Sequence, residues 1–283
     1  MSNLPKIPDP SQNAEIIPFI GVHDALSASI AAKYFDGIFC SGYGFAASHY
    51  GMPDEGFIAW PDLIAYVARL RAIVPDTRIL VDIDDGYGDP NIAANVVRRL
   101  ELTGASAVIM EDQRRPKKCG HLPGKEIITK EEYLNRLDSI LQVRNEIFIV
   151  ARTDADNLPD GIDRATRYAE GGADAVMVEG LRTLEEVQAV KKEIGNTPLV
   201  VNIISGGKTE PVDMYQLHNA GADFVIYSTP TLFPAQEAIE KSIAKLKENN
   251  GNVESTGCNV GLSQSNSLLK ENLASVLRWN KKM

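Results

Sequence analysis

The sequence predicts a (β/α)8 barrel, and two features of its hydrophobic pattern lead to this prediction. Eight short apolar runs recur along the 283 residues, and amphipathic stretches of helical period separate them. Strands that are apolar throughout are typical of a parallel sheet covered by helices. Eight such units in a chain of this length match a closed barrel. A doubly wound open sheet is the alternative, but no Gly-x-Gly-x-x-Gly motif follows the first run.

The expected elements follow one another with short connections. Gly104, Gly172 and Gly221 each end a helix just before a strand, as is usual where a helix leads into a strand. The predicted strands are residues 16–22, 37–40, 79–84, 107–111, 147–152, 175–179, 199–203 and 224–227. The predicted helices are residues 25–35, 61–74, 91–102, 130–143, 162–170, 184–194, 212–219 and 234–247.

The last part of the chain is expected to lie outside the barrel. The barrel is assigned to residues 1–248, and residues 249–283 are assigned to a linker and a helical extension. Residues 249–267 are polar and contain glycine, which favours a linker. Residues 268–279 resume a helical pattern, with one apolar side formed by Leu268, Leu269, Leu273, Val276 and Leu277. Such a helix has to dock on its own barrel or on a neighbouring subunit.

Composition and charge exclude several classes of function. The net charge of −9 provides no basic surface for nucleic acid or for an anionic membrane. No signal-peptide core is present, and no run approaches the roughly 20 apolar residues of a membrane span. The three cysteines are widely spaced and fit neither a disulfide framework nor a zinc motif. These features predict a cytoplasmic protein with reduced thiols.

Polar groups stand at the ends of seven of the eight predicted strands. In a barrel, the carboxyl ends of the strands converge on one mouth, so these groups are expected to form one site. Any single one could instead cap a helix or brace a loop. The groups are Ser41-Gly-Tyr-Gly44, Asp82 with Asp84, Glu111, Arg152, Glu179, Asn202 and Ser228.

Asp82 and Asp84 are the candidate metal ligands. They stand two residues apart in an expected strand, so alternation would place both carboxylates on one face. Two adjacent carboxylates repel unless a cation or a shared proton relieves them, and oxygen ligands suit Mg²⁺ or Mn²⁺. Glu111 and Glu179 would complete the cage through bound water. The alternative is that Asp82 pairs with Arg152 or a lysine while Asp84 and Asp85 cap the next segment.

The loop after the fourth predicted strand carries the most reactive group. Pro116 and Gly120 exclude regular structure there. Cys119 is flanked by Lys117, Lys118 and His121, which are expected to lower the pKa of its thiol. The alternative is a solvated basic loop with an incidental thiol.

The glycines of Ser41-Gly-Tyr-Gly44 offer backbone N–H groups to an anion, although such turns often bind nothing.

Two motifs resemble the isocitrate lyase/phosphoenolpyruvate mutase superfamily: Asp-x-Asp-x-Gly-Tyr-Gly from Asp82, and Lys-Lys-Cys-Gly-His from Lys117. The resemblance covers about residues 18–247. It implies a barrel enzyme with Mg²⁺ near Asp82 and Asp84 and with Glu111 in the surrounding shell. It also implies a small oxo- or hydroxy-acid substrate that carries a second carboxylate or a phosphonate.

The resemblance further implies roles for other residues. Residues 117–121 would be a mobile gate that brings Cys119, with Lys117, Gly120 and His121, over the substrate. Ser41, Gly42 and Tyr43 would hold a substrate carboxylate, and Arg152, Glu179 and Asn202 would line the site. Cys119 would protonate a carbanion after carbon–carbon cleavage. Family members are typically homotetramers that exchange C-terminal helices, which would explain the extra helix here.

The resemblance leaves the substrate open. The cysteine in the gate separates carbon–carbon lyases from phosphoenolpyruvate mutase, whose gate resembles Lys-Thr-Asn-Ser. Methylisocitrate lyases have tyrosine where Phe39 stands and tend to have proline where Ser228 falls. Serine there looks more like petal-death protein and the oxaloacetate acetylhydrolases. We therefore expect a lyase or hydrolase acting on an oxaloacetate-, alkylmalate- or methylisocitrate-type dicarboxylate. The alternative is a phosphonate enzyme, either a phosphoenolpyruvate or carboxyphosphonoenolpyruvate mutase or a phosphonopyruvate hydrolase, and the carboxyphosphonoenolpyruvate mutases keep the Cys-Gly-His gate. A non-catalytic barrel is disfavoured because the motifs are intact.

Overall fold

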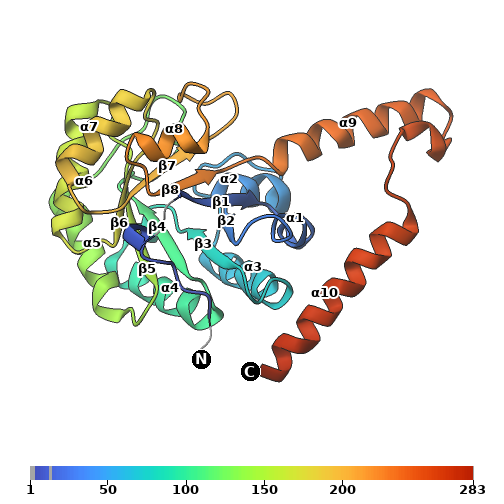
Figure 1. Ribbon diagram of the computed structural model, residues 1–283, viewed down its shortest axis with the longest axis horizontal. Coiled ribbons are helices and arrows are strands. Elements are labelled where there is room, and N and C mark those ends of the chain that lie inside the picture. Colours follow the sequence, from blue (N-terminus) through green and yellow to red (C-terminus); the bar gives the residue numbers. More distant parts are fainter. Residues whose placement is uncertain (1–3, 13–14, 283) are drawn as a thin grey trace.

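The computed structural model describes residues 4–12 and 15–282, and eight parallel strands close into a barrel in the order β1 to β8 (Figure 1). Strand β1 pairs with both β2 and β8, which closes the sheet. The predicted (β/α)8 fold is confirmed. The strands are β1 Ile17–Val22, β2 Gly37–Cys40, β3 Arg78–Asp82, β4 Ala107–Glu111, β5 Phe148–Thr153, β6 Ala175–Val178, β7 Leu199–Ile203 and β8 Phe224–Tyr227.

Helices surround the barrel on its outer face (Figure 1). Short 3₁₀ turns lie at Pro10–Gln12, Gly86–Gly88 and Val253–Thr256, and a π-helical turn lies at Ala46–Tyr50. The α-helices are α1 Ala25–Ala31, α2 Gly42–Phe45, α3 Trp60–Ile73, α4 Pro90–Thr103, α5 Lys130–Val143, α6 Leu158–Glu170, α7 Leu184–Ile194, α8 Met214–Asn219, α9 Leu232–Glu248 and α10 Leu262–Lys282.

Strand alternation divides the core into two layers. Phe39, Leu80 and Ile109 belong to the apolar cluster formed by the strands' inward positions. Their neighbours Ile38 and Ile79 belong to the larger cluster that includes helix side chains. The strands are apolar throughout because both layers exclude water, and burial of each such side chain stabilises the fold by about 1.5–3 kcal/mol. The polar residues at the carboxyl ends of the strands lie beyond these two apolar layers, at the mouth of the barrel.

The helix termini are set by local signals in the sequence. Asp24 and Thr129 each form a capping box at the start of their helices, so the first backbone N–H groups are satisfied. Gly104 ends α4 with φ 101°, a left-handed conformation that glycine adopts without a steric penalty. These signals explain why most predicted helix boundaries agree with the structure within a few residues.

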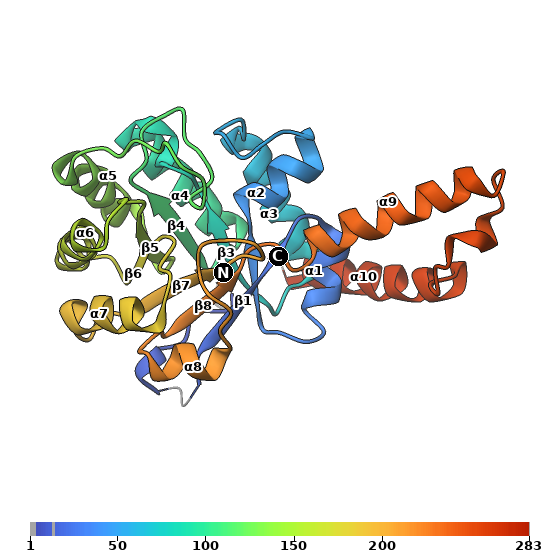
Figure 2. The ribbon, with the colours of Figure 1, turned by 90° about the horizontal axis from the view of Figure 1, so that it is seen from above.

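Helices α9 and α10 lie outside the barrel wall (Figures 1 and 2). Helix α9 extends away from β8 and has no buried residue, and α10 runs back to contact α3. The Lys33 ammonium lies 3.1 Å from the Glu271 carboxylate and ties α10 to the segment after α1. The linker predicted at residues 249–267 is wrong in extent, because α10 begins at Leu262. The first turns of α10 are exposed, so their polar side chains remain in contact with solvent and are compatible with a helix.

Within the described residues, no helix is both long enough and apolar enough to cross a membrane.

Asp112 joins three elements just beyond β4. Its carboxylate accepts hydrogen bonds from Thr153 Oγ1 at 2.7 Å and from Tyr168 OH at 2.9 Å, and it pairs with Arg164 at 3.0 Å. Replacing Asp112 with alanine would leave the buried Arg164 without this partner, so the free energy of unfolding is expected to fall by about 3–5 kcal/mol. Urea unfolding would measure this change. Asp138→Ala, on the exposed face of α5, is the control, and equal stabilities would contradict the expectation.

Candidate active site

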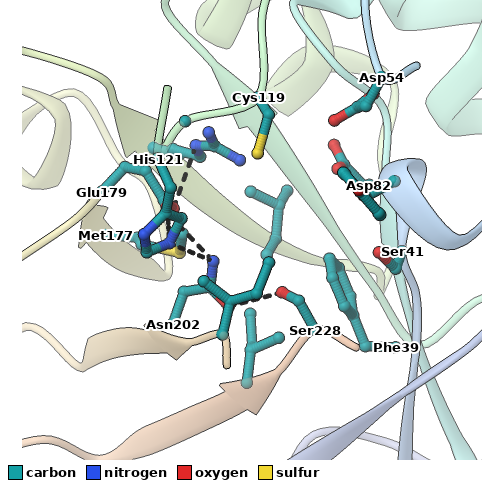
Figure 3. Close-up of a pocket in the computed structure, with 16 residues that line it drawn as sticks. Phe39, Ser41, Asp54, Asp82, Cys119, His121, Met177, Glu179, Asn202 and Ser228 are labelled. Atoms are coloured by element: carbon teal, nitrogen blue, oxygen red, sulfur yellow. Dashed lines mark hydrogen bonds and ion pairs between the residues drawn. The ribbon is translucent and has the colours of Figure 1, made fainter. Parts of the chain in front are cut away.

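Most of the predicted residues line a pocket at the C-terminal mouth of the barrel (Figure 3). Gly42, Asp84, Glu111 and Lys117 lie behind this lining rather than in it. Four apolar side chains from inside the barrel and Ile204 complete the wall. The pocket is lined by Phe39, Ser41, Tyr43, Asp54, Asp82, Ile109, Cys119, Gly120, His121, Arg152, Met177, Glu179, Asn202, Ile204, Ile226 and Ser228.

The pocket has two chemically different sides. Asp54, Asp82 and Ser41 lie on one side in Figure 3, and Glu179, His121 and Asn202 lie on the other. The sulfur of Cys119 points into the space between them from the loop above. The mouth can therefore place a thiol against a ligand that spans the two sides.

A buried lysine organises the acidic side. Lys117 Nζ lies 2.6 Å from Asp84 Oδ1, 2.9 Å from Asp54 Oδ1 and 3.9 Å from Glu111 Oε1. Burial alone would lower the pKa of the Lys117 ammonium, but these carboxylates raise it well above its ordinary value. Lys117 thus remains charged and attaches the start of the loop to the acidic side.

The expectation that Asp82 and Asp84 share one strand face is wrong. Strand β3 ends at Asp82, and Asp84 adopts a left-handed backbone conformation with φ 51°. The Asp82 carboxylate accepts the Asp84 N–H at 3.0 Å, so the chain turns back on itself there. Asp82 consequently faces the pocket while Asp84 faces Lys117.

The acidic side fits a hard divalent cation. Asp84 Oδ2 and both carboxylate oxygens of Glu111 are buried and accept no hydrogen bond, and their contacts with Arg115, Lys117 and Arg152 are ion pairs at 3.2–3.9 Å. Burial raises the pKa of Asp82 to about 6, although Lys117 opposes the shift. In the described part of the chain, no three His, Cys, Asp or Glu side chains form a direct metal-binding group. Buried carboxylate oxygens of this kind are the donors that hard divalent cations bind.

The opposite side is a connected network around Arg152. The Arg152 guanidinium donates two hydrogen bonds to Asp154, at 2.8 and 2.9 Å, and lies 3.2 Å from Glu111 and 3.5 Å from Glu179. Burial alone would raise the pKa of Glu179, but Arg152 and His121 hold it well below its ordinary value. Glu179 is therefore an ionised group that orients its neighbours, and it is a weak base.

Asn202 and Ser228 extend this network across the pocket (Figure 3). Ser228 Oγ donates to Asn202 Oδ1 at 2.6 Å, and Asn202 Nδ2 donates to Glu179 Oε1 at 3.0 Å. The hydroxyl of Ser228 thereby determines which end of the Asn202 amide faces Glu179. Residue 228 influences the pocket through this contact as well as through its own size.

The loop that carries Cys119 is held over the pocket by several contacts. The Gln113 side chain binds both the N–H and the C=O of Lys118, each at 2.9 Å. Lys125 Nζ donates to Gly120 O at 2.8 Å and to Asp154 Oδ1 at 3.1 Å. We call residues 117–121 the gate loop, because these contacts join it to both sides of the mouth.

The expectation that neighbouring cations lower the pKa of Cys119 is wrong. Burial raises the pKa of its thiol, and the His121 backbone N–H only partly opposes this. Lys117 points toward the buried carboxylates and Lys118 Nζ binds Gly124 O, so neither ammonium stabilises a thiolate at Cys119. Cys119 is a protonated thiol near neutral pH and is suited to donate a proton.

Iodoacetamide labelling tests the state of Cys119. Only thiolate reacts, so the half-buried Cys119, whose thiol pKa is raised, is expected to react at least about tenfold more slowly than the exposed Cys258 near neutral pH. Mass spectrometry of the two cysteine peptides measures both rates in one sample. Equal rates would show that Cys119 is an accessible thiolate.

The segment Ser41-Gly-Tyr-Gly44 forms the first turn of α2. Ser41 is the N-cap, and its Oγ accepts the Gly44 N–H at 3.1 Å. A side chain at position 42 would have its Cβ 2.9 Å from Asp82 Oδ2, so glycine permits the close packing of this turn on the acidic side. The Tyr43 ring meets Phe233 of α9 edge-on, with centroids 5.9 Å apart.

The sequence interpretation missed Asp54 and Lys125. Asp54 comes from the loop between α2 and α3, where no strand end marked it, yet it lines the pocket and pairs with Lys117. The only feature of the sequence that could have indicated Asp54 is its position after a proline in a turn that contains glycine. His23 lies outside the lining and contacts Thr231 Oγ1 at 3.0 Å.

A closed parallel barrel with charged side chains at its C-terminal mouth is the architecture of (β/α)8-barrel enzymes, so the fold and the site place this chain in that class. Within that class, the chain belongs to the phosphoenolpyruvate phosphomutase family, whose sequence model matches residues 11–247. The resemblance to the isocitrate lyase/phosphoenolpyruvate mutase superfamily is confirmed.

Two curated relatives cover most of the chain. The chain is 36% identical to 2-methylisocitrate lyase of Halalkalibacterium halodurans, over 82% of its own length and 78% of that protein. It is 32% identical to 2,3-dimethylmalate lyase of Eubacterium barkeri, over 88% of both chains. These relatives are named as lyases.

Two solved structures show the same architecture. A crystal structure of 2,3-dimethylmalate lyase matches with a TM-score of 0.88 at 27% identity, covering 94% of this chain and 91% of the other. Oxaloacetate acetylhydrolase in complex with 3,3-difluorooxalacetate matches with a TM-score of 0.86 at 27% identity, covering 95% and 93%. The match extends to nearly the whole chain.

Proposed function

We propose that this protein cleaves a carbon–carbon bond in a small 2-oxo or 2-hydroxy dicarboxylate and uses Cys119 as the proton donor. The observation that carries the proposal is the position of the protonated Cys119 thiol between Asp54 and Asp82 on one side of the pocket and Glu179, His121 and Asn202 on the other (Figure 3). The names of the relatives support this reaction class, since they include lyases of methylisocitrate and dimethylmalate.

The reaction would divide between the two sides of the pocket. A general base takes the proton of the C2 hydroxyl as the C2–C3 bond breaks, so C2 becomes a carbonyl and the electron pair remains on C3 next to a carboxylate. The thiol then gives its proton to C3, and the protonated base can restore the thiol. We assign Cys119 to protonating C3, and His121, Glu179 and Asn202 to orienting the substrate. Arg152 would stabilise the oxo-acid end, and such electrostatic stabilisation is usually the largest contribution to catalysis. Ser41, Gly42, Tyr43 and Gly120 would contact the substrate carboxylate.

A divalent cation, proposed to be Mg²⁺, would be held by Asp82 with Asp84 and Glu111. When bound, it would supply positive charge for the oxygens of the oxo acid. The buried carboxylate oxygens of Asp84 and Glu111, which accept no hydrogen bond, support this assignment. Mn²⁺ has the same preference for oxygen ligands and would suit the same residues.

Phe39 and Ser228 favour a substrate of the oxaloacetate or alkylmalate type. Phe39 is 5% exposed and presents hydrocarbon to the pocket, so no hydroxyl at this position can contact C2. Ser228 supplies a hydroxyl on the neighbouring wall instead and is bonded to Asn202. The structural match to oxaloacetate acetylhydrolase supports this choice. Cleavage of hydrated oxaloacetate would yield oxalate and acetate.

Incubation with Mg²⁺ and separate 2-alkylmalates, 2-methylisocitrate and oxaloacetate tests the reaction class. Release of an oxo acid or oxalate, dependent on Mg²⁺ and removed by chelation, is the expected result. A chain that turned over none of them would not be a lyase of this type.

Ser228→Pro and Phe39→Tyr should shift preference away from oxaloacetate if these residues select the substrate.

A phosphonate reaction is the second candidate, because the matching family model is that of phosphoenolpyruvate phosphomutase. The cysteine of the gate loop argues for carbon chemistry, since a proton donor is needed where a carbanion forms. Phosphorus NMR of phosphonopyruvate with the protein and Mg²⁺ decides between the two. Conversion of phosphonopyruvate without activity on the dicarboxylates would favour the phosphonate reaction.

We also propose a cytoplasmic homotetramer in which C-terminal helices are exchanged between subunits. Leu269, Leu273 and Leu277 recur every four residues on α10 and are each at least half exposed. Ile239 and Ile243 are similarly exposed on α9, so both helices have apolar faces without cover in one chain. The free thiols of Cys40, Cys119 and Cys258 support a reducing compartment.

Light scattering tests the assembly. The wild-type protein is expected to have the mass of four chains, and Leu269→Ser with Leu273→Ser and Leu277→Ser should shift it to smaller species. Serine removes the apolar area whose burial would drive association. Glu254→Ser, in the exposed turn before α10, is the control. A monomeric wild-type protein would contradict the proposal.

A further inference from the structure

The loop between β7 and α8 contacts the end of the gate loop. We call residues 206–209 the clasp segment. The backbone N–H of Lys208 donates to His121 Nδ1 at 3.0 Å, and Lys208 Nζ reaches Gly120 O at 3.3 Å. Two successive residues of the gate loop are therefore bound by a single residue of the clasp segment.

The clasp segment is itself held in place by the loop after β6. Thr209 Oγ1 donates to Leu181 O at 2.6 Å, and Glu210 N donates to Arg182 O at 2.9 Å. These contacts connect it to the strand that ends next to Glu179. The segment can therefore act as a fixed support for the gate loop.

Gly207 provides the space that the His121 ring occupies. A Cβ at this position would lie 2.7 Å from His121 Nδ1 and 2.3 Å from Ile204 Cγ2. Contacts under 3 Å are not tolerated, so any larger residue would displace the ring or the loop. Glycine at position 207 is needed for the imidazole to reach the Lys208 N–H.

This contact determines where His121 carries its proton. A backbone N–H can only donate, so Nδ1 must be the unprotonated acceptor nitrogen. In neutral imidazole the proton then resides on Nε2, which lies 2.7 Å from Glu179 Oε1 (Figure 3).

We propose that the clasp segment is the docking site of the gate loop and holds His121 as the neutral tautomer protonated at Nε2. His121 is then a positioning residue that donates to Glu179, and it is not available as a base. Cys119 remains the group of the gate loop that can give a proton to the pocket. The docking and the tautomer follow from the contacts alone, whereas this last consequence rests on the proposed lyase reaction.

Nitrogen NMR of protein labelled with ¹⁵N-histidine tests the tautomer without any substrate. His121 is expected to show an unprotonated Nδ1 and a protonated Nε2 near neutral pH, and the spectrum of His121→Asn identifies its signals. A protonated Nδ1, in either the other tautomer or an imidazolium, would overturn the proposal. This measurement needs no altered clasp segment, so it remains decisive if a variant there fails to fold.

Limited trypsin digestion tests the docking. Cleavage after Lys117 and Lys118 requires the gate loop to open, and its rate follows the open population when closing is fast. Loss of one hydrogen bond should raise that rate about fivefold, so Gly207→Ala is expected to cleave at least that much faster than wild type. Lys208→Ala removes only the ammonium and should show a smaller increase with an unchanged tautomer.

Ser205→Ala, an exposed neighbour that lines no part of the pocket, is the matched control and should cleave at the wild-type rate. Gly207→Ala that folds and cleaves at the control rate would overturn the docking proposal. Both experiments use the substrate-free protein. A failure of lyase activity would therefore leave their outcome unaffected, and a wrong tautomer would leave the lyase reaction open.

Discussion

Replacing Cys119 with serine is expected to lower kcat by about 10²–10⁴-fold, the usual contribution of a general acid. The thiol is protonated because burial raises its pKa, and it points into the pocket between the two charged sides (Figure 3). A serine hydroxyl is a far weaker acid, so it cannot protonate the carbanion at a comparable rate. Steady-state kinetics on the best substrate of the dicarboxylate panel measure the change.

Substrate affinity should be nearly unchanged in the Cys119 variant, because serine keeps the size of the side chain and the surrounding gate contacts. Cys258→Ser is the control, since Cys258 is exposed in the segment between α9 and α10. An unchanged kcat in the Cys119→Ser protein would remove Cys119 from the reaction and would require another proton donor.

Replacing Gly120 with alanine is expected to reduce kcat/KM by about 10²-fold, because misplacement of a catalytic group by 1 Å can cost this much. The added Cβ would lie 2.3 Å from Arg152 Nη2 and 2.4 Å from Glu179 Cγ. The gate loop could not settle over the pocket without moving these side chains. Kinetics on the dicarboxylate substrate and trypsin cleavage after Lys118 would report the loss of closure together.

The stability of the Gly120→Ala protein should change little, since the gate loop can shift outward without exposing the barrel core. Leu122→Ala, directly after the gate loop, is the matched control, because Leu122 is 53% exposed. Wild-type activity in Gly120→Ala would show that the loop does not close in the way this structure places it.

The barrel was predictable because its determinants are local or repetitive. Inward and outward positions of each strand are both apolar, and capping residues such as Asp24 and Thr129 mark the helix starts. Convergence of the strand ends then follows from the topology, so the order of residues is enough to predict Asp82, Arg152 and Glu179 at one mouth. The motifs around Asp82 and Cys119 likewise pointed to the superfamily.

Several features of the site could not be deduced from sequence, because they depend on contacts between distant loops. Asp54 follows no strand and reaches the pocket only through the path of its loop. Asp84 leaves the strand face because its backbone is left-handed, and Lys117 then fills the space between carboxylates. Burial raises the pKa of the Cys119 thiol, and the lysines beside it in the sequence point away from the sulfur.

The order of apolar and polar residues therefore determines that the chain forms a barrel and which side chains meet at its mouth, since both depend on periodicity and on chain direction. The state of each group is decided by tertiary packing. Desolvation keeps the Cys119 thiol protonated, and a backbone N–H of Lys208, 87 residues away in sequence, selects the nitrogen of His121 that holds a proton. Charge and proton positions respond to neighbours within a few ångströms, and the fold alone determines which neighbours those are.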